Sequence, residues 1–180
     1  MRIICLLGKS GTKKNLVKYT LEKLGYNRLT SYTTRNTKEG EVNGAEYHFV
    51  DKDSFFKLVE KHIIMEWAQF NGHFYGSPHP IGSINNVVVV EPGGYKSIKD
   101  VYGKQVTGVF ISVTQSIQDK VAEKKRKNAD QNVVVSLAAR INTDDHKFKG
   151  IEKKVDLVVD GEQDVESIVA EILRYVAEKR

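Results

Sequence analysis

The sequence predicts an α/β protein in which a parallel β-sheet carries helices on both faces. The first observation is the unbroken β-branched run Val87–Val90, which is typical of a central strand buried on both faces. The second is that residues 106–113 and 155–159 are similarly apolar and are separated from it by helical patterns. The third is the start of the chain, where the apolar residues 3–7 end abruptly at Gly8 and a helical pattern follows.

Composition limits the class of protein. The chain has 180 residues, 40% hydrophobic and 28% charged, which is typical of a single soluble domain. No apolar run approaches the ~20 residues that span a membrane, and the N-terminus lacks a signal-peptide pattern. The single cysteine, Cys5, cannot form an internal disulfide, so we expect a cytoplasmic protein with Cys5 packed in the core. The net charge of +5 favours anionic ligands without choosing among nucleotides, nucleic acids and acidic membranes.

Residues 8–15 have the layout of a loop that binds phosphate. Backbone N–H groups and the start of the following helix face the anion in such a loop, and a lysine reaches the outer phosphates. In the pattern G-x-x-x-x-G-K-[ST], Gly8 and Lys14 are in register. Lys13 stands at the second glycine, however, and Asn15 replaces the hydroxyl residue that would hold Mg²⁺. On these residues alone, an ordinary strand-to-helix turn with a basic helix start remains possible.

The elements between these strands can be placed by the residues that begin and end helices and turns. The first helix extends to about Leu24, with Gly25 at its C-cap. Asn43-Gly44 predicts a tight turn between two extended pieces, and either Asp51 or Asp53 caps the helix that follows. Residues 63–70 and 73–76 predict a pair of extended segments around Asn71-Gly72. Further helices are expected at residues 97–102, 117–127, 133–141 and 165–176.

Residues 31–77 interrupt the alternation of strands and helices, which suggests an inserted substrate lobe. Five short motifs follow one another there: Ser31 with Thr33-Thr34-Arg35, Gly40-Glu41-Val42-Asn43-Gly44, Tyr47-His48-Phe49-Val50, Glu66-Trp67-Ala68 and Tyr75-Gly76-Ser77. In this order and spacing the chain resembles the guanylate kinase family. The whole chain can be laid on that family, and the match weakens after residue 85.

The resemblance implies a single domain with a P-loop NTPase-type, three-layer fold and a parallel sheet. The core would consist of residues 1–30, 85–115 and 150–180. A small GMP-binding β lobe would be inserted at about residues 31–84, and a helical lid at about residues 116–149.

The resemblance also implies how GMP is bound. A phosphate dianion needs cations and hydroxyl donors. A guanine ring offers two donors, N1–H and its 2-amino group, and one carboxylate can accept hydrogen bonds from both. Glu66 matches the residue for that task and Ser77 the hydroxyl that donates to O6. Lys38 stands where the family usually has arginine, which keeps the charge but loses the bidentate geometry. The implied GMP-binding residues are Ser31, Arg35, Lys38, Tyr47, Glu66, Tyr75, Ser77 and Glu91.

Several of these assignments have simpler alternatives. Arg35 and Lys38 taken alone would be solvated surface charges, and Tyr47 and Tyr75 would be strand aromatics. The family shows Asp-x-Asp after the buried strand, where this chain has Val89 and Glu91, so only the second acid is present.

For the donor, the resemblance implies ATP with Mg²⁺, and no metal site built from the protein alone. Lys14 would contact the outer phosphates, and lid arginines would neutralise the transferring phosphoryl group. Arg140 matches a lid arginine, whereas the basic run 124–127, which includes Arg126, fits a solvated helix face equally well. The implied catalytic residues are Lys14, Arg126 and Arg140. The implied ATP-binding residues are Gly8, Ser10, Gly11, Thr12, Lys13, Lys14 and Asn15.

The predicted function is ATP-dependent phosphorylation of GMP, and of dGMP, by a cytoplasmic monomer or homodimer. The departures at Lys13, Asn15 and Val89 leave a second hypothesis open, a guanylate-kinase-like binding module that has lost catalysis. A third keeps the kinase but changes the nucleoside monophosphate. Binding to nucleic acid is the weakest reading, because no basic strand with interleaved aromatic residues is present, and no membrane association is expected.

Overall fold

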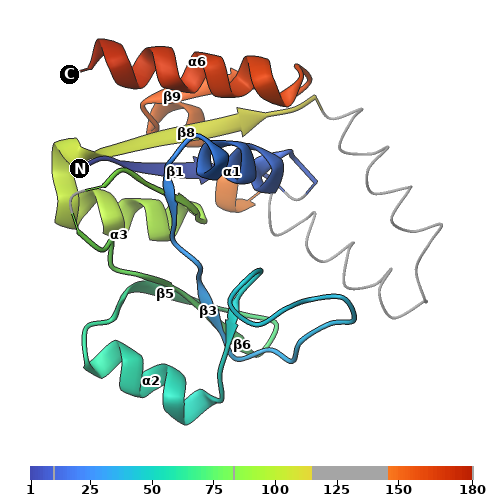
Figure 1. The fold of residues 1–180 in the computed structure, drawn as a ribbon, viewed down its shortest axis with the longest axis vertical. Coiled ribbons are helices and arrows are strands. Elements are labelled where there is room, and N and C mark those ends of the chain that lie inside the picture. Colours follow the sequence, from blue (N-terminus) through green and yellow to red (C-terminus); the bar gives the residue numbers. More distant parts are fainter. Residues whose placement is uncertain (10, 83, 115–145, 180) are drawn as a thin grey trace.

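The computed structural model describes residues 1–9, 11–82, 84–114 and 146–179. Its centre is a five-stranded parallel sheet with the strand order β2-β7-β1-β8-β9 (Figure 1). The apolar segments that the sequence indicated are all strands of this sheet. The short edge strand β2 was not predicted, because two residues leave no periodicity to detect. The strands are β1 (Ile3–Leu7), β2 (Asn27–Arg28), β7 (Asn86–Val89), β8 (Val106–Ser112) and β9 (Leu157–Asp160).

Helices cover both faces of the sheet and make three layers. Helices α1 (Lys14–Lys23) and α6 (Val165–Glu178) lie on one face, and α3 (Pro92–Tyr102) lies on the other (Figure 1). The short turns η1 (Gly103–Gln105) and η2 (Ile151–Lys153) follow α3 and precede β9. No helix among the described residues is long and apolar enough to cross a membrane. The α/β fold with a parallel sheet is confirmed.

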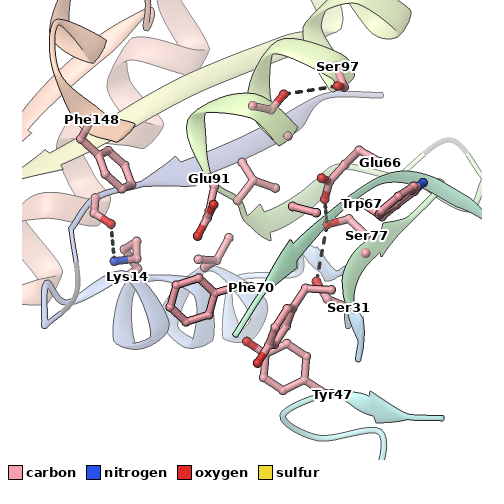
Figure 2. A pocket seen from close by; sticks show the side chains of 18 residues that line it. Lys14, Ser31, Tyr47, Glu66, Trp67, Phe70, Ser77, Glu91, Ser97 and Phe148 are labelled. Carbon is pink, nitrogen blue, oxygen red and sulfur yellow. Dashed lines mark hydrogen bonds between the residues drawn. The ribbon is translucent and has the colours of Figure 1, made fainter. Parts of the chain in front are cut away.

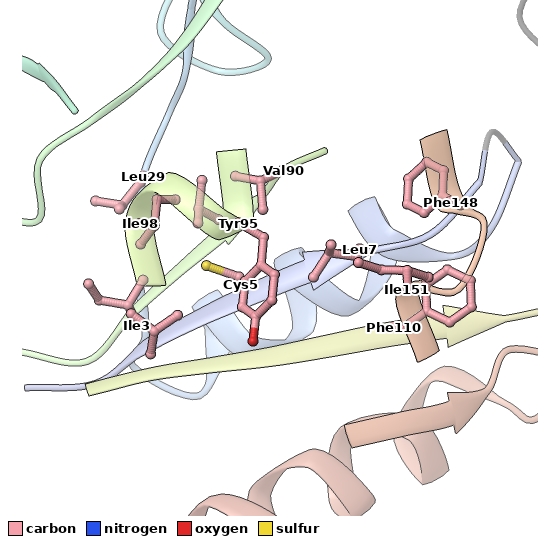
Figure 3. Close-up of a cluster of buried hydrophobic side chains, with 12 residues drawn as sticks. Ile3, Cys5, Leu7, Leu29, Val90, Tyr95, Ile98, Phe110, Phe148 and Ile151 are labelled. Atoms are coloured by element: carbon pink, nitrogen blue, oxygen red, sulfur yellow. The ribbon is translucent and has the colours of Figure 1, made fainter. Parts of the chain in front are cut away.

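Strand β1 supplies both cores, because successive side chains of a strand point to opposite faces. Ile3, Cys5 and Leu7 pack with α3, whereas Ile4 and Leu6 pack with α1 and α6. All five are fully buried, which accounts for the unbroken apolar run. Cys5 lies beside the ring of Tyr95 from α3 (Figure 3). Burial raises the pKa of its thiol far above the ordinary value, so Cys5 is a packing residue as predicted.

The helix boundaries follow their capping residues. Gly25, with φ of 91°, comes directly after the C-cap of α1. Asp51 caps α2 (Lys52–Glu60) by accepting a 2.7 Å hydrogen bond from the Ser54 amide, which decides between the two predicted aspartates. Helix α3 begins at Pro92, five residues before the predicted start at 97. Apolar periodicity missed this first turn, which contains proline and two glycines.

A second sheet, with the order β4-β3-β6-β5, forms a smaller lobe with α2 (Figure 1). The predicted pair around Asn71-Gly72 is confirmed as the antiparallel strands β5 and β6. The Asn43-Gly44 turn is also present, and the Gly44 amide donates to the Tyr47 carbonyl. Short extended pieces flank this turn as predicted, β3 before it and β4 after it, but they pair in parallel and do not form an antiparallel hairpin. The strands are β3 (Tyr32–Thr33), β4 (His48–Phe49), β5 (Ile64–Phe70) and β6 (His73–Pro78).

Asp156, just before β9, joins β8 and α3 beneath the central sheet. Its carboxylate accepts hydrogen bonds from the Gly108 amide at 2.7 Å, the Tyr95 hydroxyl at 3.1 Å and the Lys99 ammonium at 2.9 Å. We expect Asp156→Ala to lower the free energy of unfolding by about 2–3 kcal/mol, because it leaves the Gly108 N–H without its side-chain acceptor and removes the carboxylate that faces the Lys99 ammonium. Urea unfolding measures this change. The control Asp156→Asn keeps an acceptor and should lose about half as much; equal losses would contradict the assignment.

Candidate nucleotide-binding site

A cavity of about 490 Å³ lies between the central sheet and the small lobe. It opens beyond the carboxyl ends of β1 and β7, which is where ligands bind in open parallel sheets. Both lobes supply its lining, so the cavity exists only because the two are packed together (Figure 2). The predicted site residues that line it are Gly8, Lys14, Ser31, Tyr47, Glu66, Tyr75, Ser77 and Glu91.

Glu66 and Ser77 form the polar centre of this cavity. They are paired residues of β5 and β6, so their side chains emerge on the same face. The Ser77 hydroxyl donates a 2.5 Å hydrogen bond to Glu66 Oε1, and its oxygen lies 3.5 Å from that of Ser31 (Figure 2). Burial raises the pKa of the Glu66 carboxyl above its ordinary value, and the hydrogen bond from Ser77 partly offsets this. The result is a carboxylate with acceptor capacity left for a ligand.

The other side of Glu66 faces the first turn of α3. A Cβ atom built on Gly94 would lie only 2.6 Å from Glu66 Oε2, so only glycine lets the carboxylate approach this closely. A negative charge is favoured near the first turn of a helix, where N–H groups are unpaired. Sequence reasoning missed Gly94; the two adjacent glycines Gly93-Gly94 after Pro92 were the available signal.

Arg35 lies beside the cavity, and its guanidinium is held by Glu41. The two form a bidentate ion pair, with Arg35 Nη1 2.7 Å from Glu41 Oε2 and Nη2 2.5 Å from Oε1. The guanidinium carbon also lies 5.2 Å from the ring centres of Tyr47 and Phe49. Lys38 is exposed, and its backbone N–H donates to Glu41. The sequence quoted Glu41 only as part of a motif and did not predict this contact.

Lys14 is folded back onto its own loop. Its ammonium donates to the carbonyls of Gly8 and Lys9, at 2.6 and 2.7 Å, and to the Thr12 hydroxyl at 2.9 Å. A smaller cavity of about 170 Å³ lies beside Lys9 and Thr12, against the end of β8. The loop therefore already gathers one cation and several polar groups at the mouth of the larger cavity.

The two unusual loop residues lie apart from this cluster. The Lys13 ammonium donates to the carbonyls of Glu162 and Gln163, in the turn before α6. Asn15 is exposed in the first turn of α1. Of the other predicted residues, Ser10, Arg126 and Arg140, with the basic run 124–127, fall outside the described residues.

The described residues contain no cluster of three or more His, Cys, Asp or Glu side chains that would bind a metal. The carboxylates that line the cavity are those of Glu66 and Glu91. The Glu91 carboxylate accepts a 2.7 Å hydrogen bond from the ammonium of Lys147, a residue that sequence reasoning did not single out. Magnesium that arrives with a nucleotide takes most of its ligands from phosphate and water, so this lining is compatible with a metal–nucleotide complex.

Comparison with known proteins identifies the family. A family model described as guanylate kinase matches residues 2–179. The chain belongs to the guanylate kinase family. A guanylate kinase of Wolinella succinogenes is 36% identical over 118 residues, which are 61% of this chain and 55% of that protein. One from the Aster yellows witches'-broom phytoplasma is 30% identical over 159 residues, 87% of this chain and 67% of that protein.

A solved structure supports the fold of this guanylate kinase family member. The guanylate kinase of Anaplasma phagocytophilum superposes with a TM-score of 0.75 at 22% identity, covering 99% of this chain and 85% of that one. The match to the Wolinella protein, in contrast, spans little more than half of that relative's length. The family and the P-loop NTPase-type fold are therefore established.

Gly94→Ala tests the contact between Glu66 and α3. We expect the variant to be about 1–3 kcal/mol less stable than Gly93→Ala, because the new methyl group overlaps the Glu66 carboxylate. Gly93→Ala is the matched control, since its methyl group meets no atom within 4 Å and brings a similar helix propensity. Urea unfolding compares the two. Adding Glu66→Ala to Gly94→Ala should recover the loss, and equal stability of the two glycine variants would refute the contact.

The ion pair between Arg35 and Glu41 predicts a pH dependence of stability. Hydrogen bonding to Arg35 lowers the pKa of Glu41 from 4.5 to about 2. The pair therefore stabilises the fold fully above about pH 4.5, and this contribution disappears as the pH falls towards 2. Glu41→Gln should cost about 1–2 kcal/mol at pH 7, and the difference from wild type should shrink across that window in urea unfolding. Exposed Glu39, changed to Gln, is the control and should show no such convergence.

Proposed function

We propose that this protein phosphorylates GMP, and dGMP, with ATP and Mg²⁺, giving the nucleoside diphosphate and ADP. The observation that carries the proposal is the pairing of Glu66 with Ser77 in the same cavity as Lys14. One end of the cavity thus has the Glu66 carboxylate beside the Ser77 hydroxyl. The other end has the Lys14 ammonium, on a loop with the layout of a phosphate-binding loop. This arrangement suits a nucleobase at one end and phosphates at the other.

Guanine fits the Glu66 end better than adenine does. A carboxylate accepts from both the N1–H and the 2-amino group of guanine, whereas adenine has an acceptor at N1. Ser77 lies within hydrogen-bond distance of Glu66 and would turn its hydroxyl towards O6. A buried acceptor that the wrong base leaves unpaired gives strong discrimination. The proposed ligands of the acceptor phosphate are Ser31, Arg35, Lys38, Tyr47 and Tyr75. Glu91 is a further proposed GMP-binding residue that does not itself bind the phosphate.

ATP would occupy the loop at residues 8–15, with its outer phosphates at Lys14. The oxygen atoms that now accept from Lys14 would be exchanged for phosphate oxygens, which are stronger partners because they are charged. The Lys13 side chain points to the turn before α6, so it does not obstruct the loop. Asn15 would offer an amide oxygen to Mg²⁺ in place of a hydroxyl, and oxygen donors of either kind suit that ion.

The proposed roles of the chain segments follow those of the family. Residues 1–30, 85–115 and 150–180 would act as the core, residues 31–84 as the acceptor lobe and residues 116–149 as the lid. Arg126 and Arg140 would neutralise charge on the transferring phosphoryl group. The chemistry needs positioning and charge neutralisation, so it calls for no covalent nucleophile. We place the reaction in the cytoplasm, with nucleotides as the partners and no nucleic acid or membrane.

A coupled assay of ADP release tests the activity. With ATP and Mg²⁺, turnover should be confined to GMP and dGMP among GMP, dGMP, AMP, CMP, UMP and dTMP. Turnover with another monophosphate would keep the kinase and overturn the role of Glu66. A folded protein that binds GMP without turnover would instead be the binding module that Lys13, Asn15 and Val89 left open.

Lys14→Met tests the donor loop. It should lower kcat at least about a hundredfold, because the cation that stabilises the outer phosphates is lost, while GMP binding changes less than about threefold. The sole tryptophan, Trp67, lines the cavity, so its fluorescence reports GMP binding without turnover. Lys18 is unsuitable as a control, because it is partly buried and burial lowers the pKa of its ammonium. Exposed Lys23, changed to Met, serves instead. Unchanged turnover in Lys14→Met would exclude this role.

A further inference from the structure

Lys147 connects the two lobes at the edge of the cavity. Its ammonium lies 2.7 Å from Glu91 Oε2, at the N-cap of α3 in the core. The same ammonium lies 5.1 Å from the ring centre of Phe70, the last residue of β5 in the small lobe. Phe70 and Glu91 both line the cavity and face it together with Lys14 (Figure 2). One side chain therefore contacts both sides of the cavity.

The backbone beside Lys147 lies at the end of the segment proposed as the lid and is packed against the core. Phe148 is 4% exposed, and its ring stacks on Phe110 of β8 with ring centres 5.9 Å apart and an interplanar angle of 27°. Figure 3 shows Phe148 within this cluster of buried side chains. Because Phe148 is anchored in this way, the Lys147 side chain extends from a fixed point. Its contact with Phe70 therefore joins the small lobe to a fixed point of the core.

This contact is separate from the place where the start of β5 meets the core. There the Glu66 carboxylate lies against Gly94 of α3, and the neighbouring Met65 packs on the core cluster. Phe70 is four residues beyond Glu66, about 13 Å away along an extended strand. A single attachment leaves a strand free to swing, whereas two attachments at this separation set its angle. The angle of β5 decides how far a ligand held at Glu66 lies from Lys14.

The charge of Lys147 also suits this position. Glu91 is a carboxylate at a cavity that would take up the phosphates of two nucleotides, and without a partner it would repel them. Lys147 neutralises that charge. A cation beside the face of an aromatic ring is attracted to it as well, so the same ammonium satisfies both contacts.

We propose that Lys147 is a positioning residue that fixes the acceptor lobe against the core, with Phe70 and Glu91 as its two contacts. The kinetic part of this proposal rests on the proposed function, whereas the structural part does not. Lys147 sets the approach of the acceptor to the donor loop, so its loss slows phosphoryl transfer while leaving the contacts of the base at Glu66 in place.

The structural part is tested by measuring the distance between the lobes without any nucleotide. Spin labels attached after Lys57→Cys in α2 and Lys104→Cys in η1 report that distance, since both lysines are exposed. The native Cys5 is fully buried and will not take the label. Electron–electron double resonance should give a narrow distribution of label-to-label distances when Lys147 is present. The distribution should be broader or shifted when Lys147→Met is added. An unchanged distribution in Lys147→Met would overturn the proposal.

Two matched variants separate this role from a general loss of charge. Lys149→Met removes an exposed lysine two residues away and should leave the distribution unchanged. Lys147→Arg keeps the cation and should restore the narrow distribution. If Lys149→Met broadens the distribution as much as Lys147→Met does, the proposal is wrong.

Kinetics then test the consequence. Lys147→Met should lower kcat for GMP about tenfold, with GMP binding by Trp67 fluorescence within about threefold of wild type. Phe70→Leu, which keeps apolar volume but removes the ring, should lower kcat by a similar factor. The kcat of the double variant should be at most about twofold lower than that of either single variant. Weaker GMP binding with unchanged kcat would overturn the positioning role. A wild-type protein without turnover would refute the proposed function, and the distance measurement would still decide the proposal.

Discussion

The site depends on one carboxylate held in a confined place. Glu66 lies between the Ser77 hydroxyl and the first turn of α3, and burial raises its pKa. Placing a carboxylate there is unfavourable unless hydrogen bonds and helix N–H groups compensate. That requirement fixes the pairing of β5 with β6, the glycine at position 94 and the approach of the small lobe to the core. A change in any of these would move the polar centre of the cavity.

Three cations at or beside the cavity have oxygen partners within the protein. Arg35 is paired with Glu41, Lys147 with Glu91, and Lys14 with the oxygens of its own loop. These contacts hold long side chains near the positions where phosphate would bind, which lowers the entropy that binding has to overcome. Phosphate gains affinity only by the difference between its contacts and those that it displaces. In the proposed complex, the cations would therefore be ordered before phosphate binds, and part of their interaction energy with phosphate would be offset by the contacts that they lose.

The departures at positions 13 and 15 have a structural explanation. In a loop that usually carries glycine at this point, the Lys13 side chain turns outward and donates to the carbonyls of Glu162 and Gln163. It thereby ties the start of α1 to the turn before α6, instead of filling the loop. Asn15 remains at the surface. The replacement at position 13 thus adds a contact between two elements of the core.

The sequence by itself determined the α/β class, the central strands and the family, because buried runs and short motifs are local patterns that a linear reading detects. It also indicated the Glu66 and Ser77 pair, which the strand register brings together. Only the tertiary structure decided which side chains meet across distant segments, such as Gly94 with Glu66, and Lys147 with Phe70 and Glu91. These contacts leave no local signal, because they depend on how two lobes pack. The parallel pairing of β3 with β4 was missed for the same reason, since a turn signal specifies the turn but not the partner of the strand.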